Sequence, residues 1–84
     1  MSEGSQHHQK YAEEIEMVSR TVAGNLLALR RQNRLTLKAV AAAAGISVGH
    51  VNRIEHGHSS AHLYTLQKLA DVYGVPMARL FDPT

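Results

Sequence analysis

The chain of 84 residues suits one small domain with a single hydrophobic core. It contains no cysteine, which excludes disulfide bonds and every cysteine-based zinc or redox site. The formal net charge of +2 is uneven: residues 1–17 hold one lysine and four glutamates, whereas residues 18–58 hold six arginines and lysines and one glutamate. This basic middle segment fits either a nucleic-acid partner or an ordinary solvated surface.

The apolar composition points to a helical fold. Apolar residues make up 44% of the chain and aromatic residues only 5%, so alanine and leucine must build the core, which favours helix over sheet. The longest apolar run, residues 39–46, is far shorter than the roughly 20 residues of a membrane span. The chain does not open on the pattern of a secretory signal. We therefore expect an all-α, soluble, cytoplasmic protein with no membrane partner.

The first third of the chain predicts a tail followed by a helix. Residues 1–10 are polar and without periodicity, and we interpret them as a flexible tail before a domain over residues 11–84. An apolar stripe with steps of three and four residues then indicates a helix: Ile15, Val18, Val22, Leu26 and Leu29. The stripe fits a helix from about Tyr11 to Asn33, which Gly24 weakens by about 1 kcal/mol, or a shorter helix capped by Ser19.

Two short helices are predicted next by their end signals. Thr36 is a good N-cap for a helix over residues 37–44, and Gly45 offers the left-handed conformation that ends a helix. Only two residues later, Ser47 can cap another helix over residues 48–56.

The last part of the chain predicts two more helices. Gly57 ends the preceding helix, and an apolar stripe over residues 63–73 then stops at Gly74. Pro76 suits the start of a last short helix over residues 77–81. The sequence thus predicts a compact domain of five helices.

The two short helices in the middle have the features of a helix-turn-helix. A small residue at Ala41 allows a close helix crossing, and Gly45 forms the corner without steric cost. Val51 and Ile54 can anchor the second helix of the pair on the core. In such a motif the outer face of that helix is free to enter the major groove of DNA.

These segments resemble a known family. LTLKAVAAAAGISVGHVNRIEHG (35–57) and LYTLQKLADVYGVP (63–76) are similar to the Cro/C1-type, lambda repressor-like helix-turn-helix domain, and the resemblance covers about residues 20–82. The start of the helix at Ser47 and the turn after Gly57 look most like the modules of regulators that also carry a ligand-sensing cupin domain. The residues that fall on the family pattern are Thr36, Ala41, Gly45, Ser47, Arg53, Glu55, Gly57, Leu66, Leu69 and Ala70.

The resemblance implies a role for each of these regions on DNA. The residues implied to read base edges are Val48, Gly49, His50, Asn52 and Arg53. The residues implied to contact phosphates are Thr36, Lys38, Ser47, His56, His58 and Ser59. Arg30 and Glu55 are implied to form an internal ion pair. The implied dimer patch consists of Val75, Met77, Leu80 and Phe81.

The chain departs from the family pattern at Leu37. The family usually has a glutamine there, which binds a phosphate and braces the recognition helix, so we expect Leu37 to pack inward instead. Because Val48 and Gly49 have no side-chain hydrogen-bonding groups, we expect specificity to depend on Arg53, Asn52 and DNA shape.

The acidic segment over residues 11–18 leaves two interpretations open. Its apolar residues either lengthen the first helix and pack on the core, or form a surface for a dimer or another partner. Its negative charge makes direct contact with DNA unfavourable.

The histidines near the predicted DNA face do not indicate a metal site. His56, His58 and His62 lie in a turn-rich segment, whereas structural zinc needs four ligands in a rigid frame. We expect neither a metal nor a cofactor. His50, His56, His58 and His62 lie near the predicted DNA face, and histidine gains charge in mild acid. We therefore predict that DNA affinity rises as the pH falls from about 8 to about 6 at fixed salt. A constant affinity over that range, in a binding titration, would contradict this prediction.

The function predicted from the sequence is that of a sequence-specific DNA-binding transcriptional regulator. It would bind a two-fold symmetric operator as a homodimer, and would act as a repressor, since repression needs only occlusion of the operator. The alternatives are an antitoxin that represses its own operon together with a protein partner, or a protein-interaction module on the same scaffold. An enzyme is not expected, because no nucleophile motif, phosphate-binding glycine loop or paired carboxylates are present.

Overall fold

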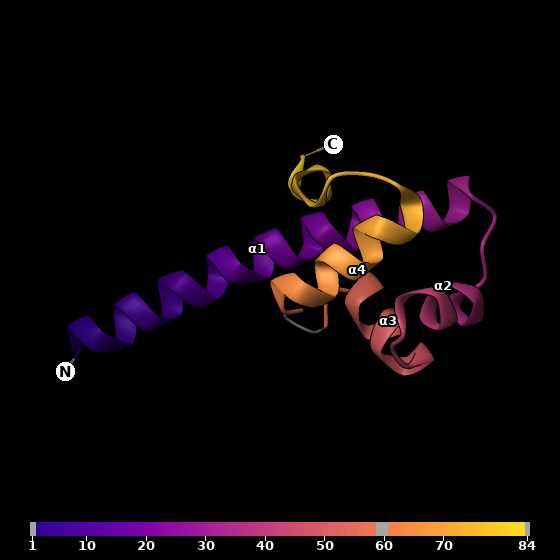
Figure 1. Cartoon of the computed structure of the whole chain (residues 1–84). Coiled ribbons are helices and arrows are strands. Elements are labelled where there is room, and N and C mark those ends of the chain that lie inside the picture. Colours follow the sequence, from indigo (N-terminus) through magenta and orange to yellow (C-terminus); the bar gives the residue numbers. More distant parts are fainter. Residues whose placement is uncertain (1, 59–60, 84) are drawn as a thin grey trace.

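The computed structural model describes residues 2–58 and 61–83, with side chains from residue 11 onward in those ranges. Its elements are α1 (Ser2–Gln32), α2 (Leu37–Ala44), α3 (Val48–Glu55), α4 (Leu63–Tyr73) and the 3₁₀-helix η1 (Met77–Phe81) (Figure 1). The described residues contain no strand, which confirms the all-α prediction.

The prediction of five helices is corrected to four α-helices and one 3₁₀-helix. The segment after Pro76 is too short to build a run of α-helical bonds, and it closes tighter turns instead. Its backbone bonds run from Arg79 N to Pro76 O at 3.0 Å and from Asp82 N to Arg79 O at 3.2 Å.

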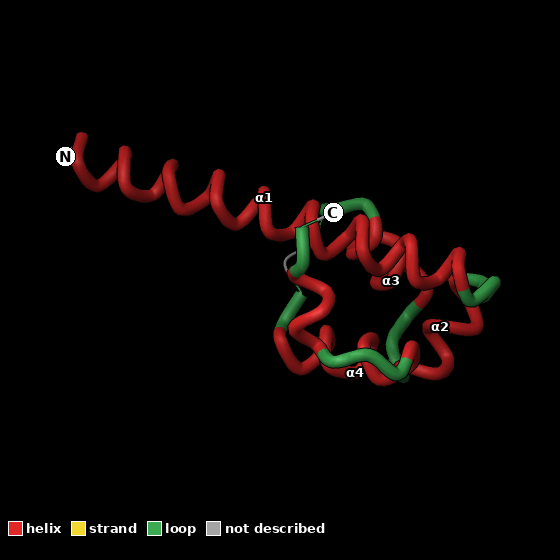
Figure 2. Tube along the Cα trace, turned by 90° about the horizontal axis from the view of Figure 1, so that it is seen from above, coloured by secondary structure: helices red, strands yellow, loops and turns green. Residues whose placement is uncertain are grey.

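Helix α1 is longer than either boundary that the sequence analysis allowed. It begins at Ser2, so residues 2–10, expected as a tail, continue the helix, and Ser19 lies in its interior. No proline interrupts residues 2–32, and each residue added to an existing helix gains a hydrogen bond. The N-terminal half of α1 projects away from the other helices (Figures 1 and 2). The domain boundary at residue 11 stays a prediction.

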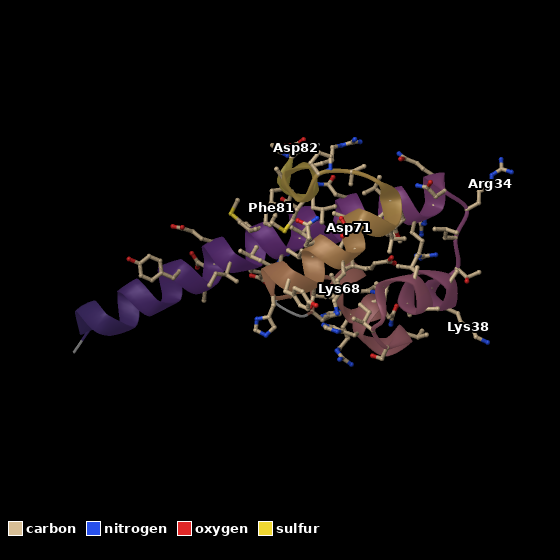
Figure 3. All side chains as sticks on the ribbon, viewed as in Figure 1. Arg34, Lys38, Lys68, Asp71, Phe81 and Asp82 are labelled. Carbon is tan, nitrogen blue, oxygen red and sulfur yellow. The ribbon has the colours of Figure 1, made fainter. Side chains whose placement is uncertain are left out.

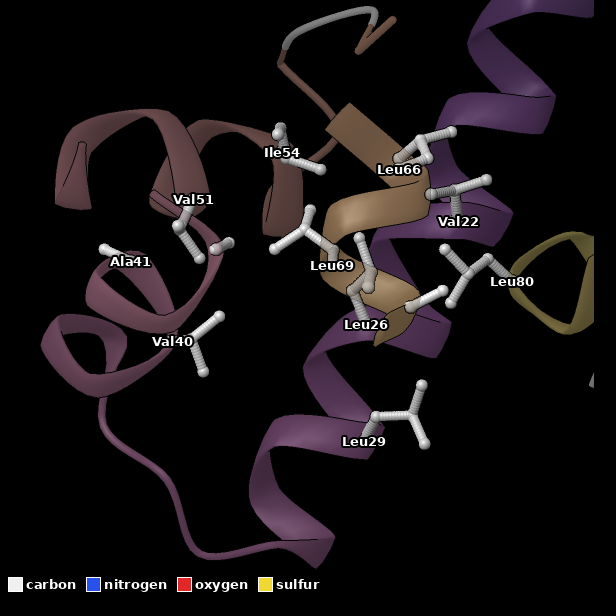
Figure 4. Packing of buried hydrophobic residues seen from close by; sticks show 12 residues of the cluster. Val22, Leu26, Leu29, Val40, Ala41, Val51, Ile54, Leu66, Leu69 and Leu80 are labelled. Carbon is white, nitrogen blue, oxygen red and sulfur yellow. The ribbon is translucent and has the colours of Figure 1, made fainter. Parts of the chain in front are cut away.

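The hydrophobic core lies between the C-terminal half of α1 and the other four elements (Figure 4). Among the described residues, α1 enters the core only from Val22 onward. The fully buried large side chains are Leu26, Val40, Val51, Leu69 and Leu80. None of the helices in the described ranges has the length and apolarity needed to cross a membrane.

The predicted end signals of α2 and α3 are confirmed. The Thr36 hydroxyl accepts a hydrogen bond from Ala39 N at 3.0 Å, and the Ser47 hydroxyl accepts one from His50 N at 3.0 Å. Gly45 takes the left-handed conformation with φ of 72°, and its N–H donates back to the last turn of α2. This corner fixes how α3 leaves α2, and it therefore determines which face of α3 meets solvent.

Two glycines provide a matched test of this backbone. Gly24 lies inside α1 with open space around it, so Gly24→Ala is expected to stabilise the domain by about 1 kcal/mol. The space around Gly45 is equally open, but its φ is +72°, so Gly45→Ala is expected to destabilise the domain by about 1–2 kcal/mol. Thermal unfolding of both variants checks the pair. Equal shifts in the melting temperature would contradict the assigned backbone.

Candidate nucleic-acid interface

Helix α3 divides into a buried face and an outer face. Val51 and Ile54 are packed in the core, and Glu55 is buried beside them. The outer face carries a set of exposed residues with helical spacing: Val48, Gly49, Asn52 and Arg53. His50 lies between the two faces and is partly buried. Four of the five predicted base-reading residues thus share one solvent-facing surface.

Arg53 and Gly49 lie close together on this outer face. The Nη1 atom of Arg53 is 3.7 Å from the point that a Cβ atom on Gly49 would occupy. The guanidinium group therefore extends back along α3 over the glycine. Since guanidinium presents paired donors that fit the O6 and N7 atoms of guanine, this arrangement can offer a bidentate contact to one base.

The N-termini of α2 and α3 bring hydroxyl groups to the same region. The Thr36 and Ser47 oxygens accept the cap bonds, and each hydroxyl proton can still be donated to a phosphate oxygen. The N–H groups of a helix N-terminus also favour an anion. Lys38, in the first turn of α2, is exposed and projects outward (Figure 3).

Two of the predicted phosphate contacts lie just after α3. His56 and His58 are exposed, and their rings stack with centroids 6.1 Å apart and an interplanar angle of 10°. The Nδ1 atom of His56 is 2.7 Å from the carbonyl oxygen of Asn52, which accepts its proton in the matching tautomer. The remaining predicted contact, Ser59, lies outside the described residues.

Arg34 is a candidate that reasoning from motifs missed. It lies in the turn between α1 and α2 with φ of 55°, a conformation in which glycine is the usual residue. Its side chain is exposed and projects at the same end of the molecule as Lys38 (Figure 3). Only the basic charge of residues 18–58 could have indicated it. An arginine where the backbone favours glycine adds a positive charge beside α2.

An ion pair ties α3 to α1. The Nε atom of Arg30 lies 2.9 and 3.1 Å from the two carboxylate oxygens of Glu55, whose side chain is only 2% exposed. Nη1 of Arg30 donates to the carbonyl oxygen of Leu35 at 3.0 Å, which also fixes the turn after α1. The hydrogen bond to Glu55 raises the pKa of Arg30 above its usual value. This pair holds α3 at its C-terminal end.

Tyr73 lies near this pair and gives a test by pH. Burial, and then the charge of Glu55, raise the pKa of Tyr73 from 10.0 to about 12. Between these values the unfolded chain loses the phenolic proton while the folded chain keeps it. The free energy of unfolding is therefore expected to fall as the pH rises from about 10 to about 12. Denaturant titrations should show a shallower fall for Tyr73→Phe, and an identical fall would contradict the burial of the phenol.

The burial of side chains bears on two further sequence predictions, the inward packing of Leu37 and the implied dimer patch. Leu37 is partly buried and packs against the core, as expected from the missing glutamine. Of the implied dimer patch, Leu80 is fully buried inside the domain, and Val75, Met77 and Phe81 are partly buried against the core. Leu80 therefore offers no surface to a second copy, because it is already used in holding η1 on α1 and α4.

The acidic segment over residues 11–18 lengthens α1, as the first of its two predicted interpretations stated, but it does not pack on the core as that interpretation also expected. Tyr11, Ile15 and Val18 are about half exposed, at 57%, 54% and 48%.

As for metal binding, the described ranges hold no group of three or more histidine and carboxylate side chains that could ligate an ion.

Comparison with known proteins assigns the fold and the motif to a family. The family model described as Helix-turn-helix (HTH_3) matches residues 26–80, which include α2, α3 and α4. The chain belongs to this helix-turn-helix family. In this helix-turn-helix domain, α2 and α3 are the pair that gives the family its name.

Two curated relatives are similar in sequence. The HTH-type transcriptional regulator DdrOP3 of Deinococcus deserti is 41% identical over 54 residues, which are 64% of this chain and 42% of that protein. An uncharacterized HTH-type transcriptional regulator of Sinorhizobium fredii, y4dJ, is 35% identical over 63 residues, which are 75% of this chain and 82% of that protein. The helix-turn-helix domain thus spans less than half of the first relative and most of the second.

Two solved structures share the fold. A crystal structure of an HTH_3 family transcriptional regulator from Vibrio cholerae has a TM-score of 0.75 at 31% identity, over 80% of this chain and 38% of that one. A hypothetical transcription factor, NHTF, from Neisseria has a TM-score of 0.75 at 21% identity, over 79% of this chain and 76% of that one. The second likeness concerns the fold alone.

Proposed function

We propose that this helix-turn-helix domain is a sequence-specific DNA-binding transcriptional regulator that places α3 in the major groove. The observation that carries the proposal is the outer face of α3, where Arg53 and Asn52 stand exposed on a helix fixed at both ends. Ser47 caps the N-terminal end, and the Arg30–Glu55 pair holds the C-terminal end. The regulators among its relatives support the same function.

In this proposal α3 reads bases and its surroundings bind the backbone. Arg53 pairs with a guanine edge, Asn52 with an adenine edge, and Val48 contacts a thymine methyl group. Thr36, Ser47 and the basic residues around α2 contact phosphates and fix the position of α3 on the duplex. The role is one of binding and not of catalysis.

The proposal extends to repression at a two-fold symmetric operator. Two copies of α3 would enter successive major grooves, with half-sites about one helical turn, or roughly 34 Å, apart. Occupation of such a site is enough to exclude other proteins from it. The likeness to the modules of cupin-linked regulators, which rests on the segments around Ser47 and Gly57, stays a prediction.

Selection from a pool of random DNA duplexes tests this function. Enrichment of a two-fold symmetric sequence is expected, followed by a steep fall in affinity for that sequence as salt is raised, because each neutralised phosphate releases counterions. If no sequence is enriched and the weak binding vanishes at physiological salt, the basic surface is only a solvated face and the proposal is wrong.

A further inference from the structure

Position 49, on the outer face of α3, holds a glycine that the backbone does not require. The glycines of positive φ are Gly45, Gly57 and Gly74, whereas Gly49 lies in the first turn of α3. Inside a helix alanine is more favourable than glycine, because glycine loses more backbone entropy on folding. The reason for a glycine at this position therefore lies in its surroundings.

The space beside Gly49 is occupied by the side chain of Arg53, one helical turn further along. The Nη1 atom of Arg53 lies 3.7 Å from the point that a Cβ atom on Gly49 would occupy. Residues four apart share one face of a helix, and long side chains point toward the helix N-terminus and cover the preceding turn. Helix geometry thus directs Arg53 over position 49, and the missing side chain leaves this path open.

The guanidinium group of Arg53 is not held by a carboxylate. Within the described ranges the ion pairs are Glu16–Arg20 and Arg30–Glu55. Glu55, the acidic residue of α3, is buried and bound to Arg30. Since Arg53 is exposed, its guanidinium group is free to bind a base edge, and position 49 governs where along α3 it lies.

We propose that Gly49 is a positioning residue for the base contact of Arg53. Because Gly49 has no side chain, the guanidinium group lies beside the first turn of α3, about one helical turn, or roughly 5 Å, before its own Cα atom. The guanine is then read opposite this turn, and a larger side chain at position 49 moves the guanidinium group away from it. The inference rests on the proposed function and extends it, by naming the residue that fixes which base pair Arg53 reads.

A glycine on a recognition helix can also serve another purpose, which is the close approach of the helix backbone to DNA. In that case a side chain at position 49 would collide with the duplex itself, whether or not Arg53 is present. The two explanations therefore differ in one measurable respect: whether the effect of a substitution at position 49 depends on Arg53.

A double-mutant cycle with Gly49→Leu and Arg53→Ala, measured by titration of labelled operator at fixed salt, tests this dependence. Leucine favours a helix, and its atoms beyond Cβ would fill the space in which the guanidinium group lies. Gly49→Leu alone is expected to weaken binding about as much as Arg53→Ala, by roughly 5- to 150-fold. In chains that already carry Arg53→Ala it should weaken binding little further, because the contact that it displaces is absent.

Gly49→Ala and Gly24→Ala are the matched controls. An alanine Cβ atom at position 49 would lie at an ordinary van der Waals distance from Arg53, so Gly49→Ala should weaken binding less than Gly49→Leu. Gly24→Ala makes the same substitution in α1, in open space, and should leave the affinity unchanged. Both alanine variants should raise the melting temperature, which separates an effect on DNA binding from an effect on folding.

Selection from random duplexes adds a readout of the sequence that is bound. Gly49→Leu and Arg53→Ala should both relax the preference for guanine at the same base pair of the enriched site, while the other positions stay selected. If the two variants relax different base pairs, Gly49 does not position Arg53 and the inference is overturned.

The failure of this inference can be told apart from the failure of the proposed function. If the unchanged chain enriches no sequence, the proposed function is wrong and the inference falls with it. If it enriches an operator, but the losses from Gly49→Leu and Arg53→Ala simply add, then α3 still binds DNA. In that case the side chain at position 49 collides with the duplex itself, and only the positioning role of Gly49 is overturned.

Discussion

Arg53→Ala is expected to weaken binding to the selected operator by about 1–3 kcal/mol, which is roughly 5- to 150-fold in the dissociation constant. The guanidinium group lies exposed on the outer face of α3, over Gly49, and would make a bidentate contact with guanine. The substitution by alanine removes that contact, so the guanine edge loses its hydrogen bonds to the protein. Titration of labelled duplex at fixed salt measures the loss, and the melting temperature should barely change, because Arg53 makes no core contact.

Two other basic residues serve as controls for Arg53. Arg79→Ala removes another exposed arginine, from η1, and it should leave affinity nearly unchanged. Lys38→Ala should weaken binding about equally to all sequences and reduce the salt dependence, since its contact is with phosphate. If Arg53→Ala loses no more affinity for the operator than for random DNA, then Arg53 does not read a base.

Arg30→Met is expected to destabilise the domain by about 3–5 kcal/mol, which is a large part of the stability of a domain of this size. Methionine keeps an apolar stem in place of the arginine stem, but it leaves the Glu55 carboxylate without its charged partner. With that side chain only 2% exposed, water cannot replace the lost hydrogen bonds. Urea unfolding followed by circular dichroism measures the loss.

Two variants separate the loss of the pair from the loss of packing. Glu55→Gln is expected to cost less than Arg30→Met, because the amide oxygen still accepts a bond from Arg30. The charge left without its partner is then that of Arg30, whose side chain is 18% exposed, and not that of the 2% exposed Glu55. The double variant Arg30→Met, Glu55→Met should recover much of the stability, since two apolar side chains can replace a buried pair. If Arg30→Met alone is neutral, the pair does not hold α3.

The residues that end helices made much of the fold predictable. Thr36, Ser47 and Gly45 each act over three or four neighbouring residues, so their roles can be inferred from local sequence. The start of α1 was not predictable in this way, since residues 2–10 contain no apolar stripe. The 3₁₀ character of η1 depends on its short length and on Asn25, whose amide donates to the carbonyl oxygens of Leu80 and Asp82 at 2.7 and 2.9 Å.

The candidate site was predictable in its centre and less so at its edges. The helical periodicity of α3 assigns Asn52 and Arg53 to its exposed face and Val51 and Ile54 to its buried face. This assignment needs only the positions of the residues in the sequence. The position of Arg34 depends on a left-handed backbone that no glycine signals. Leu80 is buried because η1 packs back against α1. The spacing of apolar residues along the sequence does not reveal this tertiary contact.

The central claim, that the outer face of α3 meets DNA, is tested most directly by two-dimensional NMR of the isotope-labelled chain titrated with the selected duplex. The largest changes in amide chemical shift are expected at residues 47–53 and 36–39, with small changes at residues 11–18 and at the start of α4. If instead the changes are confined to residues 11–18 and the start of α4, or no amide of α3 shifts as the duplex is added, then α3 is not the recognition helix and the proposed function is wrong.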